Sequence, residues 1–302
     1  MSSTLETLQK QIASGEDLFS IVRTMKALAA TSVRQYEKAA ESLDDYFHTV
    51  ELGLSVVLPA HTEIPVAPAQ DRHRPLLRIV FGSDHGLAGR FNEQIVTYAL
   101  EDYWKEEKEE GVSAENLVTF AAGEQVINRI VAAGSSPAES FGMPNSISAI
   151  TPLVQLILER IEKWRSIERV EKVLLFYNRP LTGGFRSSAE TMLPVDLSAL
   201  KETRLKWESR SLPTFTMAPA RLLSALLRQY FFVSIFRACA LSLAAENTSR
   251  LAAMQAAEKN INERLDQLKT SYQQERQAAI TEELLDIISG FKAVRTFKKD
   301  SF

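Results

Sequence analysis

Two long stretches without helix-breaking residues, one near each end of the chain, place the strongest limits on how this sequence can fold. Residues 20–57 contain no proline and one glycine, Gly53, and residues 220–302 contain no proline and one glycine, Gly290. As α-helices they would extend for about 60 and about 120 Å, at ~1.5 Å per residue. A helix of that length needs a partner to cover its apolar stripe. The sequence therefore predicts that the two stretches pair with each other.

Apolar and small side chains recur along both stretches at alternating steps of three and four residues, which is the spacing of a coiled-coil seam. In the first stretch the seam residues are Val22, Met25, Ala29, Ser32, Tyr36, Ala39, Leu43, Tyr46, Val50, Gly53 and Val57. In the second they are Leu251, Met254, Ile261, Leu265, Leu268 and Tyr272, followed by Ile280, Leu284, Ile287, Phe291 and Val294. Because the seams lie at opposite ends of one chain, we expect a long antiparallel coiled coil. A pair of ordinary bundle helices is the alternative.

The segment between the two stretches has a different pattern. The proline-rich residues 61–75 are expected to form a linker. After them, expected strands alternate with expected helices, which is the order of a parallel α/β sheet. The strands are expected at 76–81, 116–121 and 172–177, the helices at 88–105, 124–133 and 152–167, and the arms of a final hairpin at 186–188 and 191–195. The predicted fold class is therefore α/β.

The composition gives no sign of nucleic acid or membrane lipid as a partner. The formal net charge is −3, which is too small to attract a polyanion. Arg228 and Arg237 interrupt the apolar run at 222–245, which argues against a membrane span. The first residues lack the apolar core of a signal peptide, and the single cysteine, Cys239, fits a reducing compartment. We therefore expect a soluble chain.

A glycine-bearing segment, GSDHGLAGRFN at residues 82–92, follows the first expected strand, where a phosphate-binding loop would lie. The gaps between Gly82, Gly86 and Gly89 do not match the dinucleotide-binding pattern G-x-G-x-x-G, and no Lys-Ser or Lys-Thr pair follows as in a P-loop. A catalytic pair of Asp84 and His85 is disfavoured because adjacent residues rarely face each other. We expect a strand-to-helix turn in which Ser83 or Asp84 caps the next helix.

The sequence predicts no catalytic, cofactor-binding or metal site. The four histidines, at positions 48, 61, 73 and 85, show no metal-ligand spacing. The carboxylate pairs lie in the long helical stretches, where a solvated helix face is the ordinary explanation.

Three motifs, in this order along the chain, carry a resemblance. SIVRTMKALAATSVRQYE begins at Ser20, GSDHGLAGRFN at Gly82, and SLAAENTSRLAAMQAAEKNI at Ser242 continues to YQQERQAAITEELLDIISG at 272–290. They resemble the signatures of the γ subunit of F-type ATP synthases. His85, Ala88 and Arg90 depart from that family's usual arginine, cysteine and glycine. These departures indicate its divergent N-type branch, which is associated with sodium translocation.

The resemblance implies a rotor shaft without an active site. A Rossmann-like α/β domain at residues 70–215 would lie between coiled-coil helices at 1–60 and 216–302. The shaft would meet the α and β subunits of the catalytic head, and its lower part the ε subunit and the membrane c-ring of a proton- or sodium-transporting complex. This places it as a peripheral membrane protein on the cytoplasmic face of a bacterial or archaeal cell membrane.

The resemblance also assigns contact residues by motif position. Met25 and Lys26 would face β at the base of the shaft. Further polar contacts with β would come from Arg250, Gln277, Thr281 and Glu283. An apolar tip that turns in a bearing would consist of Leu285, Ile288, Phe291 and Val294. Two other classes remain open, namely a nucleotide-binding α/β enzyme with coiled-coil extensions and a coiled-coil adaptor protein.

Overall fold

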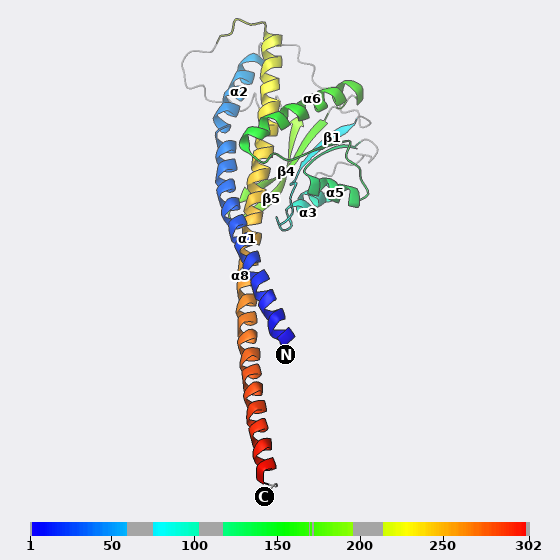
Figure 1. The fold of residues 1–302 in the computed structure, drawn as a ribbon. Helices are drawn as coiled ribbons and strands as arrows, with labels where there is room; N and C mark the ends of the chain where they lie inside the picture. Colours follow the sequence, from blue (N-terminus) through cyan, green and yellow to red (C-terminus); the bar gives the residue numbers. More distant parts are fainter. Residues whose placement is uncertain are drawn as a thin grey trace. The chain divides into compact units, whose positions relative to one another are not determined.

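The computed structural model describes residues 2–58, 75–102, 117–168, 170, 172–195 and 214–299 (Figure 1). The chain divides into two compact units. We call Met1–Leu28 with Ala253–Phe302 the helical unit, and Ala29–Ala252 the sheet unit. Two helices, α1 (Ser2–Glu41) and α8 (Pro219–Lys299), contribute residues to both units. Nearly all of the expected linker at 61–75 lies outside the described residues, so the predicted three-part division stays a prediction.

The sheet unit contains a five-stranded sheet in the order β3-β2-β1-β4-β5. The strands β1, β2, β3 and β4 are parallel to one another, and β5 is antiparallel to β4. Their bounds are Leu76–Phe81 (β1), Leu117–Ala122 (β2), Glu139–Phe141 (β3), Lys172–Leu181 (β4) and Gly184–Leu193 (β5). Every residue of β1 is buried, as expected for a central parallel strand covered on both faces. The predicted α/β class is confirmed.

Arg78 is the one charged side chain in β1, and it is buried. Its Nε donates to Thr119 Oγ1 at 2.7 Å and its Nη1 to the carbonyl oxygen of Ala99 at 3.2 Å. Burial lowers the pKa of this guanidinium to about 10. These hydrogen bonds compensate part of the cost of removing the charge from water.

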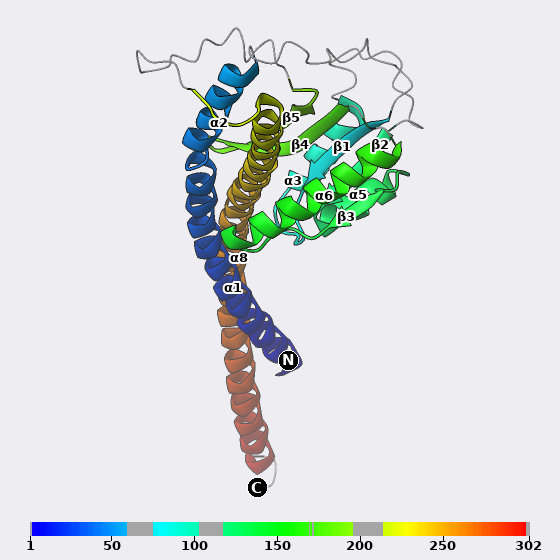
Figure 2. The same cartoon turned by 90° about the horizontal axis from the view of Figure 1, so that it is seen from above.

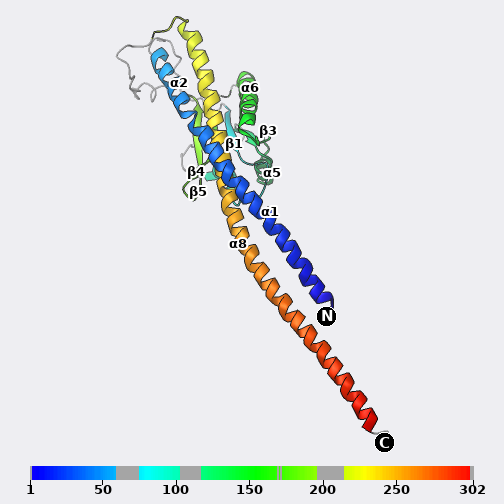
Figure 3. The same cartoon turned by 60° about the vertical axis from the view of Figure 1, so that its left-hand side comes forward.

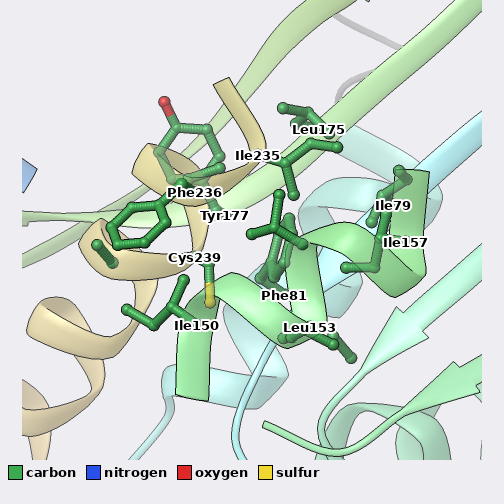
Figure 4. Close-up of a cluster of buried hydrophobic side chains, with 14 of the residues drawn as sticks. Ile79, Phe81, Ile150, Leu153, Ile157, Leu175, Tyr177, Ile235, Phe236 and Cys239 are labelled. Atoms are coloured by element: carbon green, nitrogen blue, oxygen red, sulfur yellow. The ribbon is translucent and has the colours of Figure 1, made fainter. Parts of the chain in front are cut away.

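Helices cover both faces of the sheet (Figure 1). One face packs on α3 (Phe91–Thr97) and α5 (Glu124–Ala132). The other packs on α6 (Ile150–Glu168) and on α8, through residues such as Ile235, Phe236 and Cys239 (Figure 4). Two short turns complete the unit, the π-helical η2 (Tyr98–Asp102) and the 3₁₀ turn η4 (Ile147–Ala149). The largest core of the chain therefore joins α8 to the sheet.

One helix among the described residues, α8, contains a stretch that is long and apolar enough to cross a membrane. The same helix supplies Val233, Ile235, Leu243 and Ala245 to buried positions of the sheet unit. Contact with the sheet is therefore a sufficient reason for these apolar residues, since a helix buried in a core is apolar on most sides.

The first helical stretch is interrupted, which the seam pattern did not predict. After α1 the chain turns at Ser42 and Leu43, and α2 (Asp44–Val57) begins. The Leu43 N–H donates to the carbonyl oxygen of Ala40, which tightens the last turn. Beyond the turn the seam residues Val50 and Val57 are still buried, whereas the seam residue Tyr46 is exposed and its hydroxyl donates to Gln229 Oε1 at 3.0 Å. Beyond the turn, α2 lies beside α8 (Figure 2), with Leu54 buried among leucines of α8.

The hairpin prediction was wrong about which residues form its two arms. Both expected arms, 186–188 and 191–195, fall in or just after β5, and the partner strand is an extension of β4 to Leu181. The connection is a tight turn in which Gly183 has a φ of +83°, a conformation that glycine adopts without steric cost. The helix expected at 88–105 begins at Phe91, is α-helical to Thr97 and continues as a π-helix to Asp102, while residues 103–105 lie outside the described residues.

Candidate functional site

The helical unit is an antiparallel pair formed by α1 and α8 (Figure 3). Lys26 pairs with Glu258, whereas Lys269 pairs with Glu16 at 2.8 Å, so residue numbers fall along one helix as they rise along the other. Next to the second pair Gly15 lies against Leu265, and a Cβ added at Gly15 would be 2.7 Å from Leu265 Cδ2. The predicted antiparallel seam is confirmed in this unit as far as Tyr272, but its continuation through Ile280, Leu284 and Ile287 was wrong, because these side chains are exposed.

The first two predicted contact residues lie next to this seam. Lys26 is partly buried, and its Nζ donates to Glu258 Oε2. Met25 is also partly buried. Lys26 therefore already has an anionic partner within the helical unit, and any contact with another protein would share that partner or replace it.

Three of the polar residues predicted on α8 are exposed in the helical unit. Gln277, Thr281 and Glu283 lie within two turns of one another. The Thr281 hydroxyl donates to the Gln277 backbone carbonyl oxygen at 2.8 Å, so this bond does not involve the exposed Gln277 and Glu283 side chains. Arg250 does not belong to this group, because it lies in the sheet unit.

The predicted apolar tip is exposed as far as its side chains are described. Leu285 is 58% and Ile288 51% exposed, and Ile280, Leu284 and Ile287 are exposed to a similar degree. Phe291 and Val294 belong to α8, but their side chains are not among those that the structure describes. Neighbouring leucine and isoleucine side chains are therefore exposed together on this part of α8.

In the sheet unit, Arg250 is held within the chain. Its Nη2 donates to Glu246 Oε1 at 2.6 Å, and the two side chains are only 13% and 8% exposed. The same nitrogen lies 3.5 Å from the carbonyl oxygen of Gly86. One residue earlier, the Ser249 hydroxyl donates to the carbonyl oxygen of Ala88 at 2.6 Å. The last buried turn of α8 is thus hydrogen-bonded to the loop between β1 and α3.

The other side of that loop is tied to the sheet. Asp84 Oδ1 accepts from the Glu124 N–H at 3.1 Å, and its Oδ2 accepts from the Met143 N–H at 2.9 Å. Asp84 therefore caps α5, and the prediction that Ser83 or Asp84 caps the next helix was wrong, because α3 has no side-chain cap. The Ser83 N–H donates instead to Asn92 Oδ1 at 3.0 Å.

Burial changes the titration of groups near Arg250. It raises the pKa of Glu246, an effect partly offset by Arg250 and His85 and reinforced by Asp84. Burial also raises the pKa of the Cys239 thiol. Among the described residues, no group of three or more histidine, cysteine, aspartate or glutamate side chains could hold a metal ion.

Sequence reasoning missed Glu246 and Ser249. A signal was available, because Glu246 is the only acidic residue between Pro219 and Arg250. A single carboxylate within an otherwise apolar and basic stretch requires either exposure to solvent or a cationic partner. The spacing of Glu246 and Arg250, four residues apart, supplies that partner on the same helix face.

A hollow of about 630 Å³ lies in the sheet unit between α6, β5 and the first turns of α8. Its lining includes Leu158, Phe231 and Phe232 together with Glu159 and Arg228. The glycine-bearing loop at 82–92 does not contribute to it. The enzyme hypothesis places a nucleotide at the loop of residues 82–92. This hollow therefore does not lie where that hypothesis expects a nucleotide.

The sequence has relatives over almost its whole length. Residues 4–294 match the model of a family described as ATP synthase. The ATP synthase gamma chain of Pelagibacter ubique is 29% identical over 301 residues, covering 97% of this chain and 100% of the relative. The gamma chain of Bacteroides fragilis is 28% identical over 297 residues, covering 96% of this chain and 100% of the relative.

Solved structures share the fold. The match to the rotor of the Euglena gracilis mitochondrial ATP synthase in rotational state 1 has a TM-score of 0.62 at 15% identity, and covers 93% of this chain and 100% of the other. The match to the central stalk and c-ring of the Tetrahymena thermophila mitochondrial ATP synthase has a TM-score of 0.55 at 17% identity, and covers 78% and 99%.

Proposed function

Because the chain belongs to the γ-subunit family of ATP synthases, we propose that it is the central-stalk rotor subunit of an F-type complex. It transmits torque between a membrane c-ring and catalytic sites on β subunits, and it has no active site of its own. The observation that carries this proposal is α8, a continuous helix of 81 residues. Part of it is buried in the sheet unit, and another part exposes an apolar surface in the helical unit.

The mechanism is coupling by differential contact. A shaft with chemically different sides stabilises a different conformation of each neighbour that it faces, and turning the shaft exchanges those preferences. The helical unit has such sides, because its seam is covered whereas Gln277, Thr281 and Glu283 are exposed. Its partners are the α and β subunits around the helical unit, and the ε subunit and c-ring beside the sheet unit, at the cytoplasmic face of the membrane.

The contact residues have distinct proposed roles. Lys26 exchanges its bond to Glu258 for acidic groups of β during part of the rotation, with Met25 packing beside it. Gln277, Thr281 and Glu283 form hydrogen bonds that β makes and breaks. The apolar tip, from Leu285 and Ile288 to Phe291 and Val294, turns in a bearing without directional bonds that would stop it. We also propose that the complex belongs to the N-type branch of F-type ATP synthases.

Purification of a tagged chain from native membranes tests the assignment. We expect stoichiometric α and β subunits to purify with it, together with ATP hydrolysis. A coiled-coil adaptor would purify without them. The remaining alternative, a nucleotide-binding enzyme, is tested by calorimetry of the isolated chain with ATP and NAD. Binding at micromolar nucleotide would support the enzyme and contradict the rotor proposal.

A conservative variant tests the contact residues. Glu283→Gln keeps the size of the side chain and removes its charge, and we expect it to lower the number of ions pumped per ATP hydrolysed while the complex still assembles. Glu282→Gln is the matched control, since Glu282 is an exposed neighbour on the same helix. Equal pumping ratios in the two variants would exclude Glu283 from the coupling surface.

A further inference from the structure

We infer that Glu246, Ser249 and Arg250 of α8 form a clamp on the loop at residues 85–90, and that this clamp fixes the rotational angle of α8 against the sheet. Its role in transmitting torque rests on the proposed function, whereas its existence within the sheet unit does not. The three residues act as positioning residues, because they hold another part of the same chain.

The apolar contact between α8 and the sheet supplies no directional bond that fixes that angle. The residues that α8 places against the sheet include small ones, such as Ala240 and Ala244, which are buried beside Cys239. Burial of apolar surface is non-directional, so it resists separation of helix and sheet more than rotation of the helix about its axis. Hydrogen bonds have preferred distances and angles. A polar contact at the end of the buried stretch therefore adds the missing restraint.

Two hydrogen bonds from consecutive residues give the clamp its geometry. Ser249 Oγ donates to the carbonyl oxygen of Ala88 at 2.6 Å, and the Arg250 guanidinium lies between Glu246 Oε1 and the carbonyl oxygen of Gly86. Ala245 packs against Ala88 and Phe91 on the preceding turn. Rotation of α8 would carry Ser249 and Arg250 away from the carbonyl oxygens of Ala88 and Gly86 at the same time, so both hydrogen bonds to the loop would be lost together.

The loop is firmly attached at its other side, so the clamp reaches the sheet itself. Asp84 accepts hydrogen bonds from Glu124 and Met143, the first at the start of α5 and the second after β3. Asn178 of β4 donates to the carbonyl oxygen of Phe91, at the start of α3, at 3.2 Å. The loop thus connects α8 to two strands and two helices.

This inference changes the expected role of Arg250. Its side chain is 13% exposed and already bonded within the sheet unit, so little of it is available to a neighbouring subunit. Arg250 then influences coupling by holding the loop, whereas Glu283 does so by direct contact. The two residues should therefore differ in what their variants change.

Hydrogen exchange of the full-length isolated chain tests the clamp. Ser249→Ala, which removes the bond to Ala88, and Arg250→Gln, which removes the bond to Gly86, should each raise the exchange rate of peptides from residues 83–91 by about fivefold, the change expected for one lost hydrogen bond. Peptides from β1 and β4 should keep their wild-type rates, which a general loss of stability would not allow. Ser224→Ala is the matched control, because among the described residues the Ser224 hydroxyl bonds only to the Ala220 carbonyl oxygen within α8. Unchanged exchange at 83–91 in both clamp variants would overturn the inference.

Single-molecule rotation of the assembled complex tests the mechanical role. With a probe on the sheet unit and catalysis arrested, Ser249→Ala should give a wider angular distribution than wild type and than Ser224→Ala. An equally narrow distribution would overturn the role of the clamp in transmitting torque. If the wild-type complex neither assembles nor rotates, the rotor proposal fails instead, and the exchange result still decides whether the clamp exists.

Discussion

The two parts of α8 present a contrast within a single helix. Between Val233 and Asn247, in the sheet unit, nearly every residue is buried, including Ser242 and Glu246. Between Ala253 and Gly290, in the helical unit, only Met254 and Leu265 are buried. Neither part contains a proline. Helix formation is therefore equally permitted in both, and the difference lies in what covers the side chains.

That difference separates stability from binding. Burial of apolar area stabilises a fold by about 25 cal/mol per Å², so the buried part of α8 contributes strongly to the sheet unit. The exposed part contributes little, and its residues can be selected for contact with other proteins. We therefore expect substitutions in the first part to change stability and substitutions in the second to change activity in the complex.

Thiol chemistry should give the largest contrast between the two parts. Cys239 is fully buried with a raised pKa, so it should react only when the sheet unit opens. A cysteine introduced at exposed Ser271, in a Cys239→Ala background, should react with a dithiobenzoate reagent on the order of 10³-fold faster. The release of the coloured thiol measures both rates. The burial of this part of α8 would be contradicted if the two cysteines reacted at rates within a factor of ten in the native state and at equal rates in urea.

Matched isoleucine substitutions should give the next largest effect. Ile235 is fully buried and Ile280 is 49% exposed on the same helix. Ile235→Ala should lower the free energy of unfolding by about 2–5 kcal/mol, the range for a buried isoleucine, whereas Ile280→Ala should change it by less than about 0.5 kcal/mol. Urea unfolding followed by circular dichroism gives both values. A similar loss in the two variants would mean that both parts of α8 are packed alike.

The sequence predicted the elements whose patterns come from local chemistry. The absence of breakers predicted α8, and the apolar run at 76–81 predicted β1 without error. Two features depended on tertiary contacts and were missed. The turn at Ser42 replaces one long helix by α1 and α2, and the hairpin pairs β5 with a longer β4 than its apolar residues suggested. Neither change alters the hydrophobic pattern enough to be visible in it.

The candidate site was less predictable than the fold. Motif position assigned Arg250 and Glu283 to one surface, although they lie in different units and differ in burial. A motif records which residues occur together, but it does not distinguish a contact within the chain from a contact with a partner. The bond from Ser249 to Ala88 joins residues 161 positions apart, and no local pattern predicts a contact of that separation.

Ion pairs should sharpen the comparison inside the helical unit. The side chains of Lys26 and Glu258 are 32% and 21% exposed, whereas those of Lys259 and Glu263 are 77% and 62% exposed. A double-mutant cycle with alanine should give a coupling energy of about 0.5–1 kcal/mol for the first pair. The second pair, which is screened by water, should give no measurable coupling. If the first pair also shows none, Lys26 is free to exchange its partner without cost.

Two glycine substitutions should give effects as small as that of the first ion pair and the sharpest test of the seam. A Cβ at Gly290 would meet nothing within 4 Å, so Gly290→Ala should stabilise this part of α8 by about 0.5–1 kcal/mol through the higher helix propensity of alanine. At Gly15 the same gain is opposed, because Leu265 Cδ2 would have to move away from the new Cβ. Hydrogen exchange of peptides from α1 and α8 measures both changes. A full gain at Gly15 would mean that α1 and α8 are not in close contact there, and that the helical unit is held by its ion pairs more than by its seam.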